Sequence, residues 1–213
     1  MKKSTLFAAC AMVAGALFAE TTPVMVSLCT PVQAPEASYD VTGLRLSLIY
    51  GDCHDFTGLD IGIVNSISGE FTGLAVGGAN VTEGTVHGAQ VGLLNWNGNG
   101  AAEWENRSIG GQLGVVNYAK YFCGLQDGFV NISGRRISGL QCGLLNSAED
   151  MCGVQCGYWV VFGVNVASGS VRGCQIGLLN YADTMEYGIQ IGIVNIISNN
   201  GWMPVLPIVN GHF

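Results

Sequence analysis

The chain has 213 residues, of which 32 are Gly, and only 11% are charged, giving a formal net charge of −7. Glycine at about twice its ordinary frequency argues against a mostly helical protein. Hydrophobic residues make up 49% of the chain, so it can form a core and lacks the low hydrophobicity and high charge of a disordered polymer. The acidic balance argues against nucleic acid, which is held by clustered cations. These features predict an all-β protein without a nucleic-acid partner.

Residues 1–19 have the pattern of an export signal. Lys2 and Lys3 precede an uncharged apolar stretch, and the small Ala19 stands directly before Glu20, as in a signal peptide that is cleaved at that point. A lipoprotein signal ending before Cys10 is the alternative, although it would have an unusually short apolar region. We therefore predict an exported mature chain, with an N-terminal cap or first strand in residues 20–42 and a single β-repeat domain with a C-terminal cap in residues 43–213.

An eight-residue phrase, Gly-apolar-Gln-x-Gly-apolar-apolar-Asn, recurs along the predicted repeat domain. Most copies start 15 residues apart, and two insertions are expected at 96–109 and 160–172. The clearest copies are residues 88–95, 139–146, 173–180 and 188–195, and looser copies start at Gly43, Gly58, Gly73, Gly110, Gly124 and Gly153.

Residues within each copy alternate in character, which is the period of a β-strand. Positions two, four and six are apolar, as in Leu59, Ile61 and Ile63, whereas the opposite face carries Gly, Gln and Gly. We predict a parallel β-solenoid of about ten 15-residue units, with the apolar side chains stacked inside and the amides in outward or corner ladders. Ile191→Asp is accordingly expected to lower stability more than replacement of Gln190. The predicted structural ladder comprises Gln90, Asn95, Gln112, Asn117, Gln126, Asn131, Gln141, Asn146, Gln175, Asn180, Gln190 and Asn195.

An antiparallel outer-membrane-type β-barrel is the alternative architecture. Each unit would supply one strand of about ten residues, the length that crosses an outer membrane, and Phe213 would supply an aromatic terminus. The apolar band would be only about three residues deep, however, short of a membrane barrel's band. Pro204 and Pro207 would also weaken a closing strand. The solenoid is therefore the favoured interpretation.

Seven cysteines follow the predicted signal, so at least one thiol stays unpaired in an oxidising compartment. Cys142, Cys156 and Cys174 replace apolar residues of the repeat, which predicts buried packing as small hydrophobes. Cys152 and Cys156 lack the second pair and the His partners of a zinc site. We expect neither a metal nor a cofactor.

Residues for catalysis are scarce. Of the three histidines, His54 lies in the acidic cluster of residues 52–55, where a polar turn is favoured over a metal site. The sequence contains neither a Gly-x-Ser-x-Gly nucleophile turn nor a phosphate-binding loop. A titratable constellation is the prerequisite of most catalysis, and without one we expect the protein not to be an enzyme.

Trp96 and Trp104 lie in the first insertion, which is rich in Gly and Asn. Aromatic side chains on an exposed loop can stack on a sugar or a partner protein. In the alternative interpretation the loop folds back and its indoles cover apolar surface. The folded-back loop is the favoured interpretation, and Trp96 and Trp104 are the candidate partner-binding residues if the loop is exposed.

The repeats, together with the opening at 41–51 and the ending at 202–210, resemble bacterial surface-repeat proteins, which occur as predicted secreted or outer-surface proteins of double-membraned bacteria. The resemblance spans 24–213 and implies a surface or outer-membrane location without an established activity. Residues 175–182 are also similar to curlin repeats, which implies fibre formation as a secondary expectation.

Taken with the predicted export signal, these patterns predict a non-enzymatic cell-surface repeat protein with a structural or adhesion role. The expected location is the cell surface or outer membrane of a double-membraned bacterium. Expected partners are a surface protein, a glycan, the outer membrane or a second copy of the chain. An integral outer-membrane barrel or small pore is the alternative function.

Overall fold

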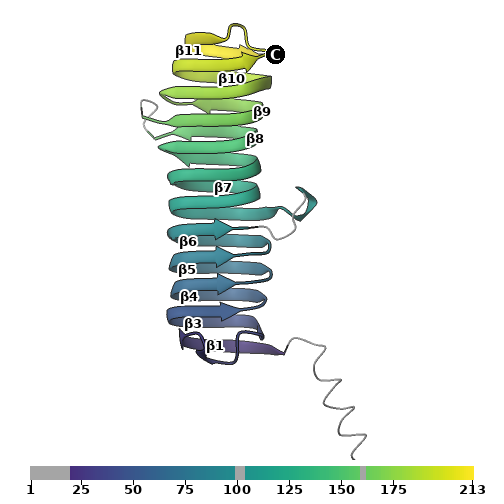
Figure 1. The fold of residues 1–213 in the computed structure, drawn as a ribbon, viewed down its shortest axis with the longest axis vertical. Coiled ribbons are helices and arrows are strands. Elements are labelled where there is room, and N and C mark those ends of the chain that lie inside the picture. The colour runs from purple at the N-terminus through teal and green to yellow at the C-terminus, as the bar shows by residue number, and fades with distance from the viewer. Residues whose placement is uncertain (1–19, 99–103, 159–161) are drawn as a thin grey trace, which may run out of the picture.

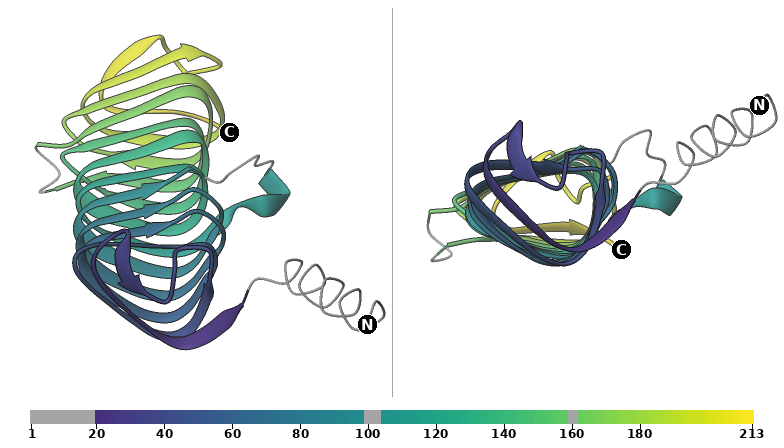
Figure 2. Two further views of the ribbon diagram at one scale, coloured as in Figure 1. Left: turned by 60° about the horizontal axis from the view of Figure 1, so that its bottom comes forward. Right: turned by 90° about the horizontal axis from the view of Figure 1, so that it is seen from below.

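The chain winds into a parallel β-solenoid whose coils stack along one long axis (Figure 1). This computed structural model describes residues 20–98, 104–158 and 162–213, so the predicted export signal lies outside the described residues. Viewed along the axis, each coil is roughly triangular (Figure 2). The predicted solenoid is confirmed, and the antiparallel barrel is wrong, because successive coils pair in parallel.

Eleven strands form one sheet in the order β11-β10-β9-β8-β7-β6-β5-β4-β3-β1-β2. The single helical element, η1, is one short turn, so the described residues contain no helix long and apolar enough to span a bilayer. The elements are β1 (Thr21–Cys29), β2 (Val32–Ala34), β3 (Asp40–Cys53), β4 (Phe56–Ile67), β5 (Phe71–Thr82), β6 (Val86–Asn97), η1 (Trp104–Asn106), β7 (Ser108–Gly143), β8 (Leu145–Gly157), β9 (Val164–Ile176), β10 (Leu179–Asn199) and β11 (Val205–His212).

Equivalent residues of neighbouring repeats lie beside one another. Between β4 and β5, for example, Gly58 pairs with Gly73 and Asn65 pairs with Asn80. We number the positions of each repeat from its opening glycine, so that Gly58 is at position 1 and Asn65 at position 8. Because the register holds from coil to coil, each position forms a column along the axis.

The columns at positions 3 and 8 are buried amide ladders. Asn side chains at position 8 form an unbroken chain from Asn65 to Asn195, in which each Nδ2 donates to the next Oδ1 over 2.7–2.9 Å. Gln side chains at position 3 form a second chain from Gln90 to Gln190, in which each Nε2 donates back to the preceding Oε1. All twelve amides named from the sequence are at most 1% exposed. The expectation that they face outward is therefore wrong.

The apolar residues at positions 2, 4 and 6 lie outside. Ile191 is 38% exposed, whereas the neighbouring Gln190 is fully buried. The inversion has a physical cause. An amide inside a ladder meets an identical amide on the coil at either side, so its donors and acceptors are satisfied, whereas the amide oxygens of the terminal Asn65 and Gln190 have no partner. Each ladder Asn before Asn195 also donates to a backbone carbonyl at position 4 of the next coil, as Asn131 does to Cys142. The predicted ranking of Ile191→Asp above a Gln190 replacement is consequently reversed.

Two further columns supply the apolar core, at positions 10 and 14. Position 14 carries bulky side chains such as Phe56 and Phe71, and position 10 carries smaller ones such as Ala148, all nearly inaccessible to solvent. At the coil of the first insertion these columns become polar through Asn97 and its neighbours, which divides the core into two clusters.

Glycine at position 1 is required by close packing of the coils. All ten of these glycines have φ between +132° and +147°, a region that other residues rarely adopt. At Gly139 an added Cβ would overlap the carbonyl oxygen of Gly124 in the preceding coil. Glycine at position 5, as at Gly143, leaves room for the ladder amide of Asn146 beside it.

An ion pair replaces the Gln ladder in the first two coils. Arg45 and Asp60 occupy position 3 and are fully buried. The guanidinium donates to both carboxylate oxygens, over 2.8 Å from Nε and 2.6 Å from Nη2, and also to the Ser66 carbonyl. Burial, only partly offset by Arg45, raises the pKa of the Asp60 carboxyl. Burial also raises the pKa of the adjacent Cys53 thiol to about 12.

Both ends of the solenoid are covered by antiparallel strands. β2 pairs antiparallel with β1 at one end, and β11 pairs antiparallel with β10 at the other. Pro207 lies within β11, where it removes a backbone donor from the outermost strand. β11 therefore covers most of the C-terminal edge, whereas β2 pairs only with Val26, Ser27 and Cys29 of β1.

The insertions differ from the sequence prediction. In the first, Trp96 and Asn97 remain part of β6 and pair with the next coil, so the excursion begins only after them. In the second, Val164 pairs with Leu145 and Asn165 with Asn146, so 164–172 is ordinary repeat rather than insertion.

Candidate interaction surface

The outer sheet face formed by positions 2, 4 and 6 is apolar along the whole solenoid. We call it the apolar face. Asp127 is the only charged residue at these positions in the described chain. Val24 and Val26 of β1 pair with Leu44 and Leu46, so they extend the face at its N-terminal end. Its members that are more than one-third exposed are Leu46, Leu48, Leu59, Ile61, Ile63, Leu74, Val76, Leu93, Leu113, Val115, Leu125, Phe129, Leu140, Leu144, Ile191 and Ile193.

Position 6 projects furthest into solvent. Ile63 is 58% exposed, Leu93 67% and Ile193 59%, in coils far apart along the axis. Between the outward rows lies a shallow apolar hollow near the N-terminal end, lined by Val26, Leu48 and Ile61 among others. A contiguous exposed patch of this kind is unusual for a protein that acts alone, because most monomers expose patches of only a few hundred Å².

Asp127 is held by a neighbouring side chain. The Tyr158 hydroxyl donates a hydrogen bond to its carboxylate. Burial, and next this hydrogen bond, raises the pKa of the Tyr158 phenol above its ordinary value. The one charge on the apolar face is thus partly satisfied within the chain, which lowers the penalty for covering it.

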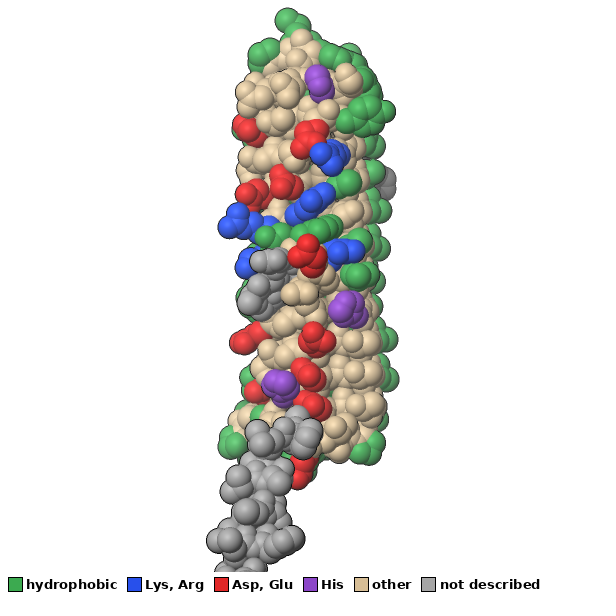
Figure 3. Space-filling view, turned by 90° about the vertical axis from the view of Figure 1, so that its right-hand side faces the viewer, with side chains coloured by type: hydrophobic (Ala, Val, Ile, Leu, Met, Phe, Trp, Pro, Cys, Tyr) green, Lys and Arg blue, Asp and Glu red, His purple; other side chains and the backbone are tan. Residues whose placement is uncertain are grey.

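Charged side chains gather on a different side of the solenoid, over the turns that follow position 10. Figure 3 looks onto this charged side, and apolar side chains line its right-hand border. Ion pairs here join neighbouring coils, with Arg135 bound to Glu149 and Arg172 bound to Glu186. These pairs are about half-exposed, so each adds little stability.

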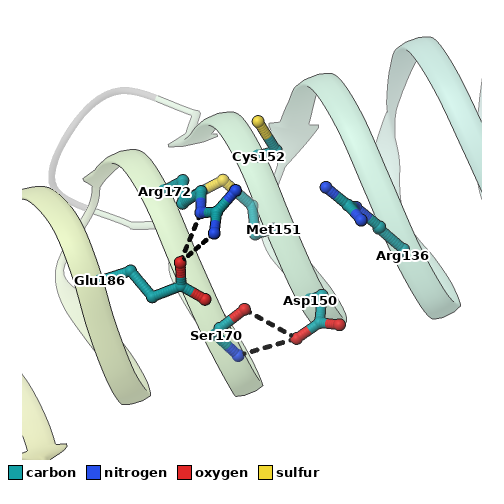
Figure 4. Close-up of a pocket in the computed structure, with 7 residues that line it drawn as sticks. All are labelled: Arg136, Asp150, Met151, Cys152, Ser170, Arg172 and Glu186. Carbon is teal, nitrogen blue, oxygen red and sulfur yellow. Dashed lines mark hydrogen bonds and ion pairs between the residues drawn. The ribbon is translucent and has the colours of Figure 1, made fainter.

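A polar hollow lined by titratable side chains lies on the charged side. In Figure 4, Arg172 and Glu186 point toward one another, and Asp150 accepts hydrogen bonds from the Ser170 backbone and hydroxyl over 2.9 and 3.0 Å. Both carboxylates are therefore engaged by neighbouring coils, and neither is positioned as a free base for Cys152. The lining residues are Arg136, Asp150, Met151, Cys152, Ser170, Arg172 and Glu186.

The two tryptophans named from the sequence pack against the solenoid. Trp96 stands at position 9 and stacks on Tyr118 of the next coil, with ring centroids 6.0 Å apart and planes 12° apart. Trp104, in η1, meets Tyr121 edge-on at 6.3 Å and lies beneath the Arg136 guanidinium at 4.6 Å. Both indoles are half-buried. Both indoles thus contact side chains of the solenoid, residues 99–103 of the loop lie outside the described residues, and a partner-binding role for the pair stays a prediction.

His54 lies in a small cluster that the sequence revealed only in part. Its Nδ1 is 3.1 Å from Asp40 Oδ1 and 3.6 Å from Asp55 Oδ1. The Asp40 carboxylate also accepts the Asp55 backbone N–H, and Asp55 accepts that of Glu70. Because the carboxylates cap the turns of successive coils, the cluster has a structural explanation. Asp40 was missed because it lies 14 residues before His54 and joins it only through coil stacking.

None of the seven described cysteines is in a disulfide. Cys142, Cys156 and Cys174 belong to the apolar face and are half-exposed, so their predicted burial is wrong for the single chain. Burial of part of each side chain still raises the pKa of Cys142 and Cys174. All three act as small apolar members of the face, and the raised pKa makes the thiols of Cys142 and Cys174 poor nucleophiles at neutral pH.

Comparison with family models, curated proteins and solved structures gave no match.

The apolar face is the feature that the sequence interpretation missed. The sequence did contain a signal for the orientation of the strands. Gly lies on the same face as Gln and Asn, and only such small residues fit beside stacked amides inside a narrow coil, so this face is the inner one.

Proposed function

We propose that this protein is a non-enzymatic, exported surface protein whose solenoid presents the apolar face for contact with a partner. The observation that carries the proposal is the continuity of that face over the full length of the described solenoid, with the charges collected elsewhere. Burying apolar area is the main source of affinity in protein association, so a face of this size is suited to binding.

Export is supported by the sequence of residues 1–19, in which two lysines precede an uncharged apolar stretch. A surface role is supported by the resemblance of the repeat, opening and ending to bacterial surface-repeat proteins. The filled interior argues against a small pore, since the ladder amides and the columns at positions 10 and 14 occupy the axis.

Two variants with three lysines each separate the apolar face from the rest of the surface. The apolar-face variant carries Ile63→Lys, Leu93→Lys and Ile193→Lys, all at position 6. The control variant carries Ser68→Lys, Ser168→Lys and Ser198→Lys, which are exposed residues of the column at position 11. Both add the same charge to side chains that already face water.

The test expresses the full chain with its own leader in a double-membraned bacterial host. We expect a mature N-terminus at Glu20, cleavage of the protein by protease added to intact cells, and retention of wild type and control variant on washed cells. The apolar-face variant should instead be released into the medium. An uncleaved chain inside the cells would contradict export, and equal retention of all three proteins would contradict a role for the apolar face.

A further inference from the structure

We propose that the partner of the apolar face is the same face of a second copy, so that the protein is a face-to-face homodimer. This inference rests on the proposed function, because it names the partner of the same surface. Retention on washed cells then depends on the dimer, since two joined copies bind a cell surface more tightly through their remaining faces than one copy does. Four properties of the molecule point to it: the area of the face, its geometry, the distribution of charge and the structure of the solenoid's ends.

The area fits a stable dimer. Ten coils at about 4.8 Å each give a face roughly 48 Å long, and positions 2 to 6 with their side chains give a width of about 15 Å. The product, about 700 Å², is within the roughly 600–1,000 Å² that each partner contributes to an interface of standard size. It exceeds the largest exposed patch of most monomers, which is about 300–600 Å².

The geometry fits a sheet-on-sheet contact. Equivalent residues stack in register, as Leu59 does on Leu74 and Ile61 on Val76, so the face consists of straight rows of aliphatic side chains. Such rows interdigitate when two sheets pack about 10 Å apart. A two-fold axis makes the contact self-complementary, since each copy offers the same rows. The apolar hollow beside Leu48 is a depression between these rows into which a side chain of the second copy can insert.

The charge distribution favours a protein partner over a lipid surface. Peripheral lipid binding relies on cations around the apolar surface, and this chain has a net charge of −7. Its arginine pairs lie over the turns on the charged side, where Arg135 and Arg172 already bind glutamates. In a face-to-face dimer both charged sides stay in water. Asp127 is then the only charged side chain on the described apolar face of each copy that enters the interface.

The ends of the solenoid direct association to its side. End-to-end growth would need exposed parallel edges, but β2 and β11 run antiparallel to the coils they cover. Pro207 removes one donor from the outer strand. This arrangement disfavours the stacking that the curlin-like repeats imply and leaves the apolar face as the largest unpartnered surface.

Asp127 supplies a specific test of the dimer. Its carboxylate would be buried between the copies with the Tyr158 hydroxyl as its one side-chain partner. Because a buried charge opposes association, Asp127→Leu should tighten the dimer, by about tenfold or more in Kd. A destabilised fold would not produce a tighter dimer, so this variant separates interface energetics from folding.

The experiment is sedimentation equilibrium of the full mature chain without detergent, for wild type, Asp127→Leu, the apolar-face variant and the control variant. We expect dimers for wild type and control, a tighter dimer for Asp127→Leu, and a Kd raised at least about a hundredfold for the apolar-face variant. Circular dichroism should be the same for all four. Monomeric wild type, or a dimer that the apolar-face lysines leave unchanged, would overturn the proposal.

A parallel flotation assay with neutral phosphatidylcholine vesicles separates failure of the dimer from failure of the proposed function. Monomeric wild type that binds vesicles, with binding lost in the apolar-face variant only, would refute the second copy and keep the face as an interaction surface. Monomeric wild type that ignores vesicles, with equal cell retention of wild type and apolar-face variant, would refute both proposals.

Discussion

Exchanging two adjacent residues tests which side of the coil is the interior. Asn146 is buried in the Asn ladder, and the preceding Leu145 is 37% exposed at the corner of the coil. Asn and Leu side chains have the same number and connectivity of heavy atoms, although the Asn amide is planar and the Leu Cγ is tetrahedral, so Asn146→Leu removes hydrogen bonds without opening a large cavity. Leu145→Asn makes the converse change outside the apolar face and leaves that face intact.

The magnitude follows from the contacts of the Asn146 amide. Its Nδ2 donates to the Cys156 carbonyl over 3.0 Å and to Asn165 Oδ1 over 2.9 Å, and its Oδ1 accepts from Asn131 over 2.9 Å. Asn146→Leu removes three hydrogen bonds worth about 1 kcal/mol each and leaves their buried partners unpaired, which costs further stability. Burial of the apolar leucine side chain offsets part of this loss. The expected net loss of stability is about 2–4 kcal/mol. Leu145→Asn should lower stability by at most about 1 kcal/mol.

The assay is urea unfolding followed by circular dichroism, at one protein concentration for both variants and wild type. A lower midpoint at unchanged slope reports a loss of stability. We expect the midpoint of Asn146→Leu to fall well below that of Leu145→Asn. Equal midpoints, or a larger fall for Leu145→Asn, would refute the assignment of the amide ladder to the interior.

Three further predictions concern the core. Asp60→Ala should lower stability by about 3–5 kcal/mol because it leaves Arg45 charged and buried. The double variant Arg45→Met, Asp60→Leu should have a urea unfolding midpoint near that of wild type. Equal losses of stability in the two variants would contradict the ion-pair account. Cys53, buried and with a pKa of about 12, should resist iodoacetamide at pH 8 until the protein unfolds, and rapid alkylation seen by mass spectrometry would contradict its burial. Gly139→Ala should lower the unfolding midpoint strongly, since its φ is +142° and its Cβ meets backbone, whereas Gly111→Ala, with open space at its Cβ, should not; similar midpoints would contradict the close packing of the coils.

The sequence was sufficient to predict the solenoid because its information is periodic. A phrase such as 139–146 recurs with Gly, Gln and Asn in the same places, and most copies start 15 residues apart. Only parallel stacking brings the same residue types together in every coil. The amide columns follow from the same register. These conclusions need only the spacing of residues, which is read directly from the sequence.

The sequence interpretation failed where it applied a general rule about burial. Strand alternation separates Ile191 from Gln190 but does not say which of them faces inward. Hydrophobic residues are usually inside, but much of a folded protein's surface is apolar, so the rule cannot be inverted. Here the narrow coil favours amides that bond to identical neighbours. The position of Trp96 was missed for another reason: its place in the coil is defined by pairing with Tyr118, beyond the insertion.

The contacts between coils also escaped the sequence interpretation. Arg45 and Asp60 are 15 residues apart and occupy a ladder position, yet the looser early repeats hid their pairing. Asp40 joins His54 by the same stacking. Both pairs are one coil apart, so a search for complementary residues at that separation would have found them.

Hydrogen exchange of the side-chain amides, measured by NMR on the folded protein, tests the central claim most directly. If the Gln and Asn columns are the interior, the NH₂ groups of residues such as Gln141 and Asn131 are 0% exposed and hydrogen-bonded to neighbouring coils. We predict that they persist in D₂O long after the amide of an exposed residue such as Asn199 has exchanged. Ladder amides that exchange as fast as Asn199 would contradict the account, because the apolar columns would then have to be the core.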